Sequence, residues 1–90
     1  MVNLRKYAWI VGGRQRVAIL KSFSRELTPS QLHKLSKHYN AKISMNNASD
    51  TVRSFEKEGI AVCLAPDRKT GRVYKLTPEG EQIRNALLKE

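Results

Sequence analysis

The sequence predicts a mainly α-helical domain that also contains one small antiparallel β-hairpin near its end. Three observations support this fold class. Apolar residues recur at intervals of three and four along four stretches, two threonine–proline pairs mark helix starts, and two short β-branched runs flank a turn-forming loop. The 90 residues are expected to form one domain over 1–90, with a modest core that needs no metal or disulfide.

Two helices are expected in the first quarter of the chain. Over residues 2–11, Leu4, Ala8 and Val11 recur at helical spacing, and the glycine pair at 12–13 then permits a turn or a kink. The second helix follows over residues 14–27 and is amphipathic and basic. Its apolar row is Val17, Leu20 and Phe23, supported by Ala18, and its outer side chains are Arg14, Arg16, Lys21 and Arg25.

The third helix, expected over residues 27–39, has the clearest start signal in the chain. Thr28 can cap the helix, Pro29 suits the first helical position, and Gln31 completes a Thr-x-x-Gln capping box. A short turn at 40–42 follows, in which Asn40 tolerates a left-handed conformation. The residues expected to face the core are Leu32, Leu35 and Tyr39.

The fourth helix is expected over residues 44–58, between the N-cap Ser44 and a left-handed Gly59. One stripe at helical spacing is apolar and is assigned to the core, and it consists of Met45, Ala48, Val52 and Phe55. The opposite stripe is polar and consists of Asn46, Asn47, Asp50, Arg53 and Lys57. Two helices joined by a tight turn, the second with a polar outer face, are a helix-turn-helix arrangement.

A β-hairpin and a last helix complete the predicted fold. The run over 60–65 and the run over 72–76 read as strands, joined by a charged loop over 66–71, and Tyr74 and Leu76 lie on one face. Thr77 and Pro78 start a helix that extends to Leu88. The apolar edge of that helix is Ile83 and Leu87.

The charge balance favours polyanionic partners. The chain carries 17 Lys and Arg against 8 Asp and Glu, a formal charge of +9, which does not by itself separate DNA from RNA or an anionic membrane surface. No stretch approaches the apolar length of a membrane span, and the first 13 residues lack the apolar core of a signal peptide. A cytoplasmic location is therefore expected, which also fits the single cysteine, Cys63.

Four short motifs occur in an order that is informative. They are Trp9, Gly13, Arg14 or Arg16, Val17 and Leu20; then Val52, Phe55, Glu56, Gly59 and Ile60; then Asp67, Arg68 and Lys69; then Tyr74, Leu76, Thr77 and Gly80. This pattern resembles the winged helix-turn-helix transcriptional regulators, most closely the small archaeal type akin to the ArsR and MarR groups. Lys69 stands where MarR-type wings have an arginine. The resemblance implies a DNA-binding domain whose hairpin is the wing.

The expected DNA-binding surface has three parts. Short amides and an arginine on the helix over 44–58 can form hydrogen bonds to base edges, the free amides at the start of the preceding helix can hold a phosphate, and hairpin cations can reach the DNA backbone or a minor groove. Asp50 is expected to pair with Arg53. The candidates are Ser44, Asn46, Asn47, Ser49, Asp50 and Arg53; Thr28, Ser30 and Lys34; and Arg68, Lys69 and Arg72. A solvated polar face, a simple cap at Thr28 and cations that serve solubility are the alternatives.

The leading functional expectation is a sequence-specific, double-stranded DNA-binding transcriptional regulator. The helix over 44–58 would enter the major groove and the wing over 60–76 would lie on the flanking backbone. The alternative is a winged-helix module that docks protein or RNA within a larger assembly. A symmetric homodimer through the first and last helices is also expected, because those helices carry more apolar surface than the core needs, at Trp9, Ile10, Ile83, Leu87 and Leu88.

Catalysis and metal binding are not expected. The chain has no phosphate loop, no nucleophile with a base at a recognisable spacing and no paired carboxylates, so it is not expected to be an enzyme or to need a cofactor. His33 and His38 are five residues apart, which is not the spacing of two ligands on one helix face. Cys63 lies in an apolar run and is expected to be a buried, inert thiol.

Overall fold

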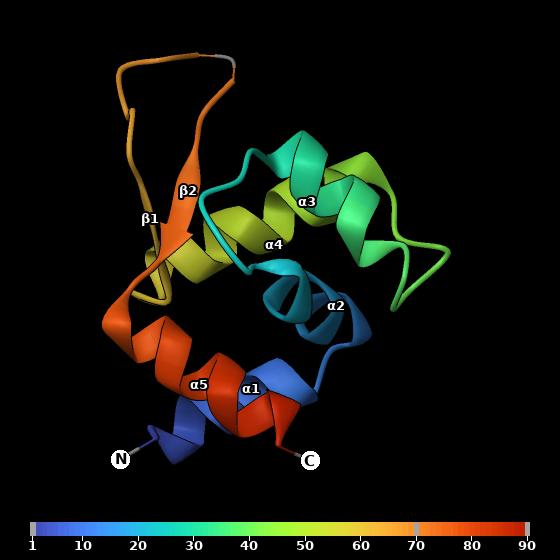
Figure 1. Cartoon of the computed structure of the whole chain (residues 1–90), viewed down its shortest axis with the longest axis vertical. Helices are drawn as coiled ribbons and strands as arrows, with labels where there is room; N and C mark the ends of the chain where they lie inside the picture. The colour runs from blue at the N-terminus through green and yellow to red at the C-terminus, as the bar shows by residue number, and fades with distance from the viewer. Residues whose placement is uncertain (1, 70, 90) are drawn as a thin grey trace.

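Helices dominate the computed structural model, which describes residues 2–69 and 71–89 (Figure 1). The two strands pair in an antiparallel sheet between the fourth and the last of the five described helices. The mainly α-helical fold class with one small hairpin is therefore confirmed. The elements are α1 (Leu4–Val11), α2 (Arg14–Ser22), α3 (Pro29–Ser36), α4 (Met45–Lys57), β1 (Ala61–Cys63), β2 (Tyr74–Leu76) and α5 (Pro78–Leu88).

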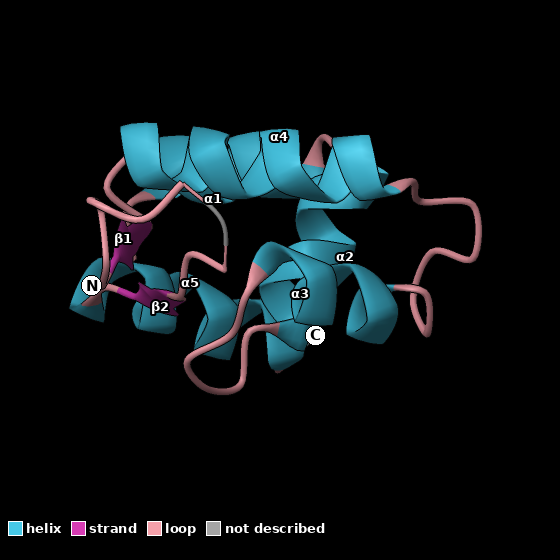
Figure 2. Cartoon of the chain, turned by 90° about the horizontal axis from the view of Figure 1, so that it is seen from above, coloured by secondary structure: helices cyan, strands magenta, loops and turns pink. Residues whose placement is uncertain are grey.

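The second helix, α2, lies at the centre of the arrangement and packs against α1, α3, α4 and α5. In Figure 1, α1 and α5 occupy the end that holds both termini, α3 and α4 occupy the other half, and the hairpin loop projects beyond the body. Seen from above, α4 runs along one whole side of the molecule (Figure 2). One long face of α4 is thus left free of the other described helices.

The core lies between the inner faces of α2 and α4, the hairpin and α5. Phe55 of α4 is fully buried, and its ring meets that of Trp9 edge to face, with 6.0 Å between the centroids. This contact holds α1 against α4. The other large side chains that are almost completely buried are Ile10, Ile19, Leu20, Leu27, Leu32, Val52, Ile60 and Ile83.

Capping residues set the starts of α3, α4 and α5 and the end of α4 as expected. Thr28 and Gln31 form the reciprocal capping box of α3, and Ser44 Oγ accepts from the Asn47 amide at 3.0 Å. Gly59 is left-handed, with φ +75°, and Thr77 caps α5. These signals are local, which is why the sequence alone located them.

The phase predicted for α1 is wrong. Leu4 and Val11 are exposed, at 77% and 44%, and Ala8 is exposed too, whereas Ile10 is completely buried. The contact of Trp9 with the core rotates the helix away from the Leu4 stripe. The helix also begins two residues later than expected, at Leu4, because Asn3 caps it.

The third helix is shorter than predicted, and of its three expected core residues only Leu32 is buried. Leu35 and Tyr39 are exposed, while Ser36 is fully buried with its hydroxyl donating to the His33 carbonyl at 2.9 Å. The small side chain of Ser36, whose hydroxyl has a hydrogen-bond partner, therefore occupies the core in place of the expected Leu35. The helix ends at Ser36, so a longer connection over 37–44 leads to α4. Asn40, in this connection, does not adopt the left-handed conformation that it could tolerate. Among the described residues, only glycines have a positive φ.

Two further expectations about apolar residues are corrected. Leu27 follows the end of α2 instead of lying in a helix, and it forms an isolated antiparallel bridge with Tyr74. Ile10, Ile83 and Leu87 are buried within the chain, so they supply no spare apolar surface for a dimer. The homodimer stays a prediction, but three of the five residues on which it was based are not available for a contact.

Candidate nucleic-acid interface

The free face of α4 presents the polar side chains that the sequence assigned to it. Asn46 and Asp50 are exposed and Asn47 is half-buried. Arg53 Nη1 lies 3.7 Å from Asp50 Oδ1, which confirms the expected pairing three residues apart. Both side chains are about three-quarters exposed, so the pair contributes little to stability and both groups remain open to solvent.

A cleft of about 380 Å³ beside this face is lined by three segments of the chain. It lies between the start of α3, one edge of α4 and the hairpin. Half of the twelve predicted site residues line it, and these are Thr28, Ser30, Ser49, Arg53, Lys69 and Arg72. The remaining lining residues are Pro29, Met45, Gly71 and Tyr74.

The stripe of α4 that lines the cleft is Met45, Ser49 and Arg53. These residues are four apart, so their side chains follow one another along the same edge of the helix. Met45 was assigned to the core but is 39% exposed, whereas Ala48, three residues on, is fully buried. The apolar stripe of α4 thus leaves the core at its first turn and enters the cleft.

A pair of backbone hydrogen bonds brings the start of α3 to the hairpin. The Leu27 amide donates to the Tyr74 carbonyl at 2.9 Å, and the Tyr74 amide donates to the Leu27 carbonyl at 2.8 Å. Thr28, the cap of α3, therefore lies directly beside β2. Sequence reasoning missed this bridge, because a single apolar residue before a helix cap carries no strand signal.

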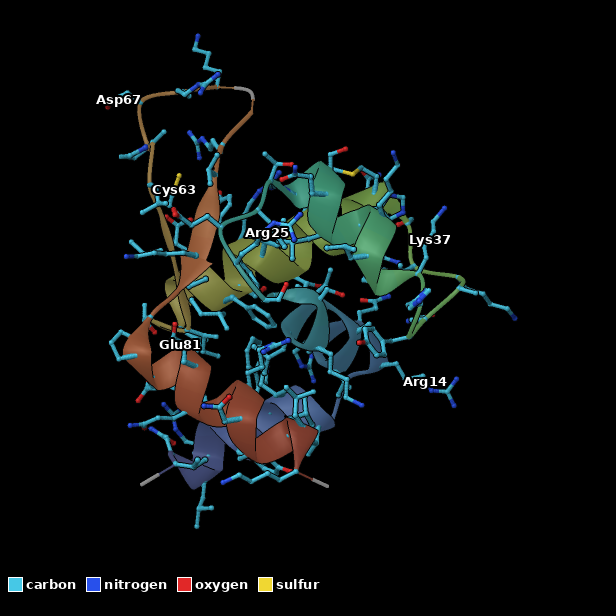
Figure 3. All side chains as sticks on the ribbon, viewed as in Figure 1. Arg14, Arg25, Lys37, Cys63, Asp67 and Glu81 are labelled. Carbon is cyan, nitrogen blue, oxygen red and sulfur yellow. The ribbon has the colours of Figure 1, made fainter. Side chains whose placement is uncertain are left out.

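The charged side chains that line the cleft are all cations, namely Arg53, Lys69 and Arg72. In the connection between β1 and β2, Arg72 Nε donates to the Arg68 carbonyl at 2.5 Å, which links the middle of the loop to the segment just before β2. Arg68 and Lys69 are exposed near the hairpin tip. Asp67, which precedes them, points away from the body (Figure 3). Thr70, in the same predicted loop, lies outside the described residues.

The helix ends near the cleft add to its positive character. The first turns of α3 and α4 contain no acidic residue, whereas the first turn of α5 contains Glu79 and Glu81. The amides that begin α3 and α4 therefore keep the positive end of each helix dipole without a neighbouring carboxylate. The cleft and the free face of α4 together suit an anionic ligand.

Six predicted site residues lie outside the cleft. Ser44 caps α4, Lys34 is exposed on α3, and Arg68 is exposed at the hairpin tip. The other three, on the free face of α4, are Asn46, Asn47 and Asp50. The candidate surface is thus continuous along α4 and is flanked by cations, instead of being one enclosed pocket.

His33 and Cys63 are both accounted for by the packing of the fold. His33 Nε2 lies 3.0 Å from the Ile43 carbonyl, which links α3 to the connection before α4. Cys63 is buried in β1, as expected. Within residues 2–69 and 71–89, no group of three or more His, Cys, Asp or Glu side chains is placed to hold a metal ion. No described helix has the length and apolar character of a membrane span.

Comparisons of this chain with models of protein families, with curated proteins and with solved structures found no match.

Proposed function

We propose that this chain is a winged-helix, sequence-specific double-stranded DNA-binding regulator, similar in type to the small ArsR- and MarR-like proteins. In this proposal α4 enters the major groove, and the hairpin acts as a wing on the flanking backbone. The formal charge of +9 supplies the attraction to a polyanion.

One observation carries the proposal. The cleft joins the start of α3, the Met45-to-Arg53 edge of α4 and the hairpin cations into one surface, and none of the described residues that line it is a carboxylate. A groove-bound helix needs base-reading groups along its free face and phosphate-binding groups to either side. Short amides and Arg53 supply the first kind of group, and the hairpin with the α3 amides supplies the second.

The proposal divides the two tasks between separate residues, which makes it testable by mutation. Contacts to phosphate depend on salt, and contacts to base edges depend on sequence. Replacing Arg68 and Lys69 with Ala should weaken preferred and random duplexes by similar factors. The slope of log affinity against log salt should fall by about 0.9 for each phosphate that the variant no longer neutralises.

Replacing Asn47 or Arg53 with Ala should act differently. If either makes a paired contact to a base, the preferred duplex should lose about 1 to 3 kcal/mol and random DNA much less. The preferred duplex is obtained first, by selection of bound sequences from random duplex DNA. Fluorescence anisotropy at several salt concentrations then gives both affinities for each variant.

A matched control removes the same charge elsewhere. Arg5→Ala with Lys89→Ala deletes two exposed cations, one in α1 and one directly after α5. Both helices lie at the end of the molecule opposite the hairpin loop (Figure 1). This variant should lower affinity less than the hairpin variant and should leave the salt slope nearly unchanged. Equal effects of the two variants would mean that only net charge matters. If selection yields no preferred sequence and none of the variants changes duplex binding, the protein- or RNA-docking alternative is favoured.

A further inference from the structure

The first turn of α4 carries an exposed apolar side chain on the surface assigned above to DNA. Met45 is the first residue of the helix, directly after its cap, and it is 39% exposed. Of the described large apolar residues that are exposed, it alone lines the cleft. Its neighbours there are polar or cationic, apart from Pro29, Gly71 and the buried Tyr74.

Core packing does not account for this exposure. The same stripe is completely buried from Ala48 onwards, so the core of α4 is complete without the end of the Met45 side chain. A flexible, polarisable thioether adapts its shape to an apolar partner. The apolar group that a duplex offers in its major groove is the C5-methyl of thymine.

We propose that Met45 contacts a thymine methyl and thereby makes one position of the DNA site specific for thymine. This inference rests on the proposed function, because it requires α4 to lie in the major groove. It adds an apolar reading residue to a face on which the sequence indicated only polar ones. Ser49 and Arg53 follow Met45 along the same edge.

The length of α4 also limits where the thymine should be. Arg53 is eight residues after Met45, which is about 12 Å along the helix axis. Neighbouring bases are about 3.4 Å apart along the duplex, so a helix inclined to the duplex axis brings these two side chains to positions at most about three to four base pairs apart. Arginine most often pairs with guanine. The site should therefore contain a thymine and a guanine within about that separation.

The test removes one methyl group from the DNA. In the preferred duplex, obtained from random sequences, each thymine is replaced singly by deoxyuridine, which keeps base pairing and lacks only the C5-methyl. At one position the unaltered protein should bind about fourfold more weakly, the effect of withdrawing one buried methyl group. Met45→Ala should bind the thymine and deoxyuridine duplexes equally.

Leu35→Ala is the matched control. It truncates a similarly exposed apolar side chain near the end of α3, outside the cleft, so it should keep the full sensitivity to deoxyuridine. Equal melting temperatures of Met45→Ala and the unaltered protein would establish that the variant is folded. Met45→Leu should retain the discrimination, because it keeps an apolar side chain of similar volume.

The outcomes separate this inference from the proposed function. A preferred sequence without thymine, or one at which no deoxyuridine substitution matters, would overturn the role of Met45 and leave DNA reading by α4 intact. Sensitivity that persists in Met45→Ala would do the same, because another group would then contact the methyl. A chain that selects no sequence would overturn both.

Discussion

Gly80→Ala is the substitution for which the structure decides most clearly whether the protein becomes more or less stable. Gly80 is buried in the first turn of α5, and a Cβ there would lie 2.1 Å from the Ile60 carbonyl oxygen. The two segments cannot separate freely. The Thr77 amide donates to that same oxygen at 2.9 Å, and the Thr77 hydroxyl donates to the Gly59 carbonyl at 2.7 Å.

Two effects of opposite sign compete in this variant. Alanine in place of glycine within an unhindered helix stabilises it by about 1 kcal/mol. Against this, the Cβ at position 80 and the Ile60 oxygen must move apart by about 0.9 Å to reach even the 3.0 Å limit, and overpacking of this kind costs about 1 to 3 kcal/mol or more. Because backbone atoms must move, we expect the clash to prevail and the variant to be less stable.

Urea denaturation followed by circular dichroism measures the free energy of unfolding. Asn85→Ala is the control for helix propensity, since Asn85 is an exposed residue of α5, and it should be neutral or slightly stabilising. In Gly13→Ala the new Cβ would meet the flexible end of Arg16, which can move away, so the destabilisation should be smaller. A Gly80→Ala variant more stable than the unaltered protein would refute the close approach of α5 to Ile60.

Three other variants test how the helices are held. Phe55→Ala should destabilise the protein by about 3 to 5 kcal/mol, because Phe55 is completely buried, and an unchanged thermal melt would contradict its place in the core. Arg84→Ala should cost about 1 to 3 kcal/mol, because the guanidinium donates to the Leu20 and Lys21 carbonyls at the end of α2, and urea denaturation would measure it. Lys6→Met should lower the free energy of unfolding by a similar amount, because Lys6 Nζ donates to the Glu58 carbonyl and pairs with Glu79. High salt should reduce the difference in stability between this variant and the unaltered protein, and a difference that does not change with salt would argue against the ion pair.

Features encoded within a few residues were predictable from the sequence. The starts of α3, α4 and α5 follow from a hydroxyl that can bond to an amide three residues on, and the end of α4 follows from Gly59. The pairing of Asp50 with Arg53 is equally local. Each of these interactions forms within one or two turns of helix, so no distant contact was needed to anticipate it.

The faces of α1 and α3 were not predictable, because more than one stripe of each helix is partly apolar. In α1, the choice between the Leu4 stripe and Ile10 is made by Trp9, whose ring packs on Phe55 of a helix some 45 residues away. In α3, buried Ser36 displaces Leu35 from the core, since its hydroxyl is satisfied by its own helix. A pattern of apolar residues cannot indicate either contact.

The candidate site lies between these two cases. Its residue types were proposed from the sequence, because amides, arginine and hairpin cations are groups that can bind nucleic acids, and that role stays a prediction. Their convergence was not proposed, because it depends on the bridge between Leu27 and Tyr74, which places the start of α3 beside the hairpin. The same reason explains why Met45 was assigned to the core. Its stripe is the buried one, and only the assembled cleft reveals that the first member of that stripe faces outwards.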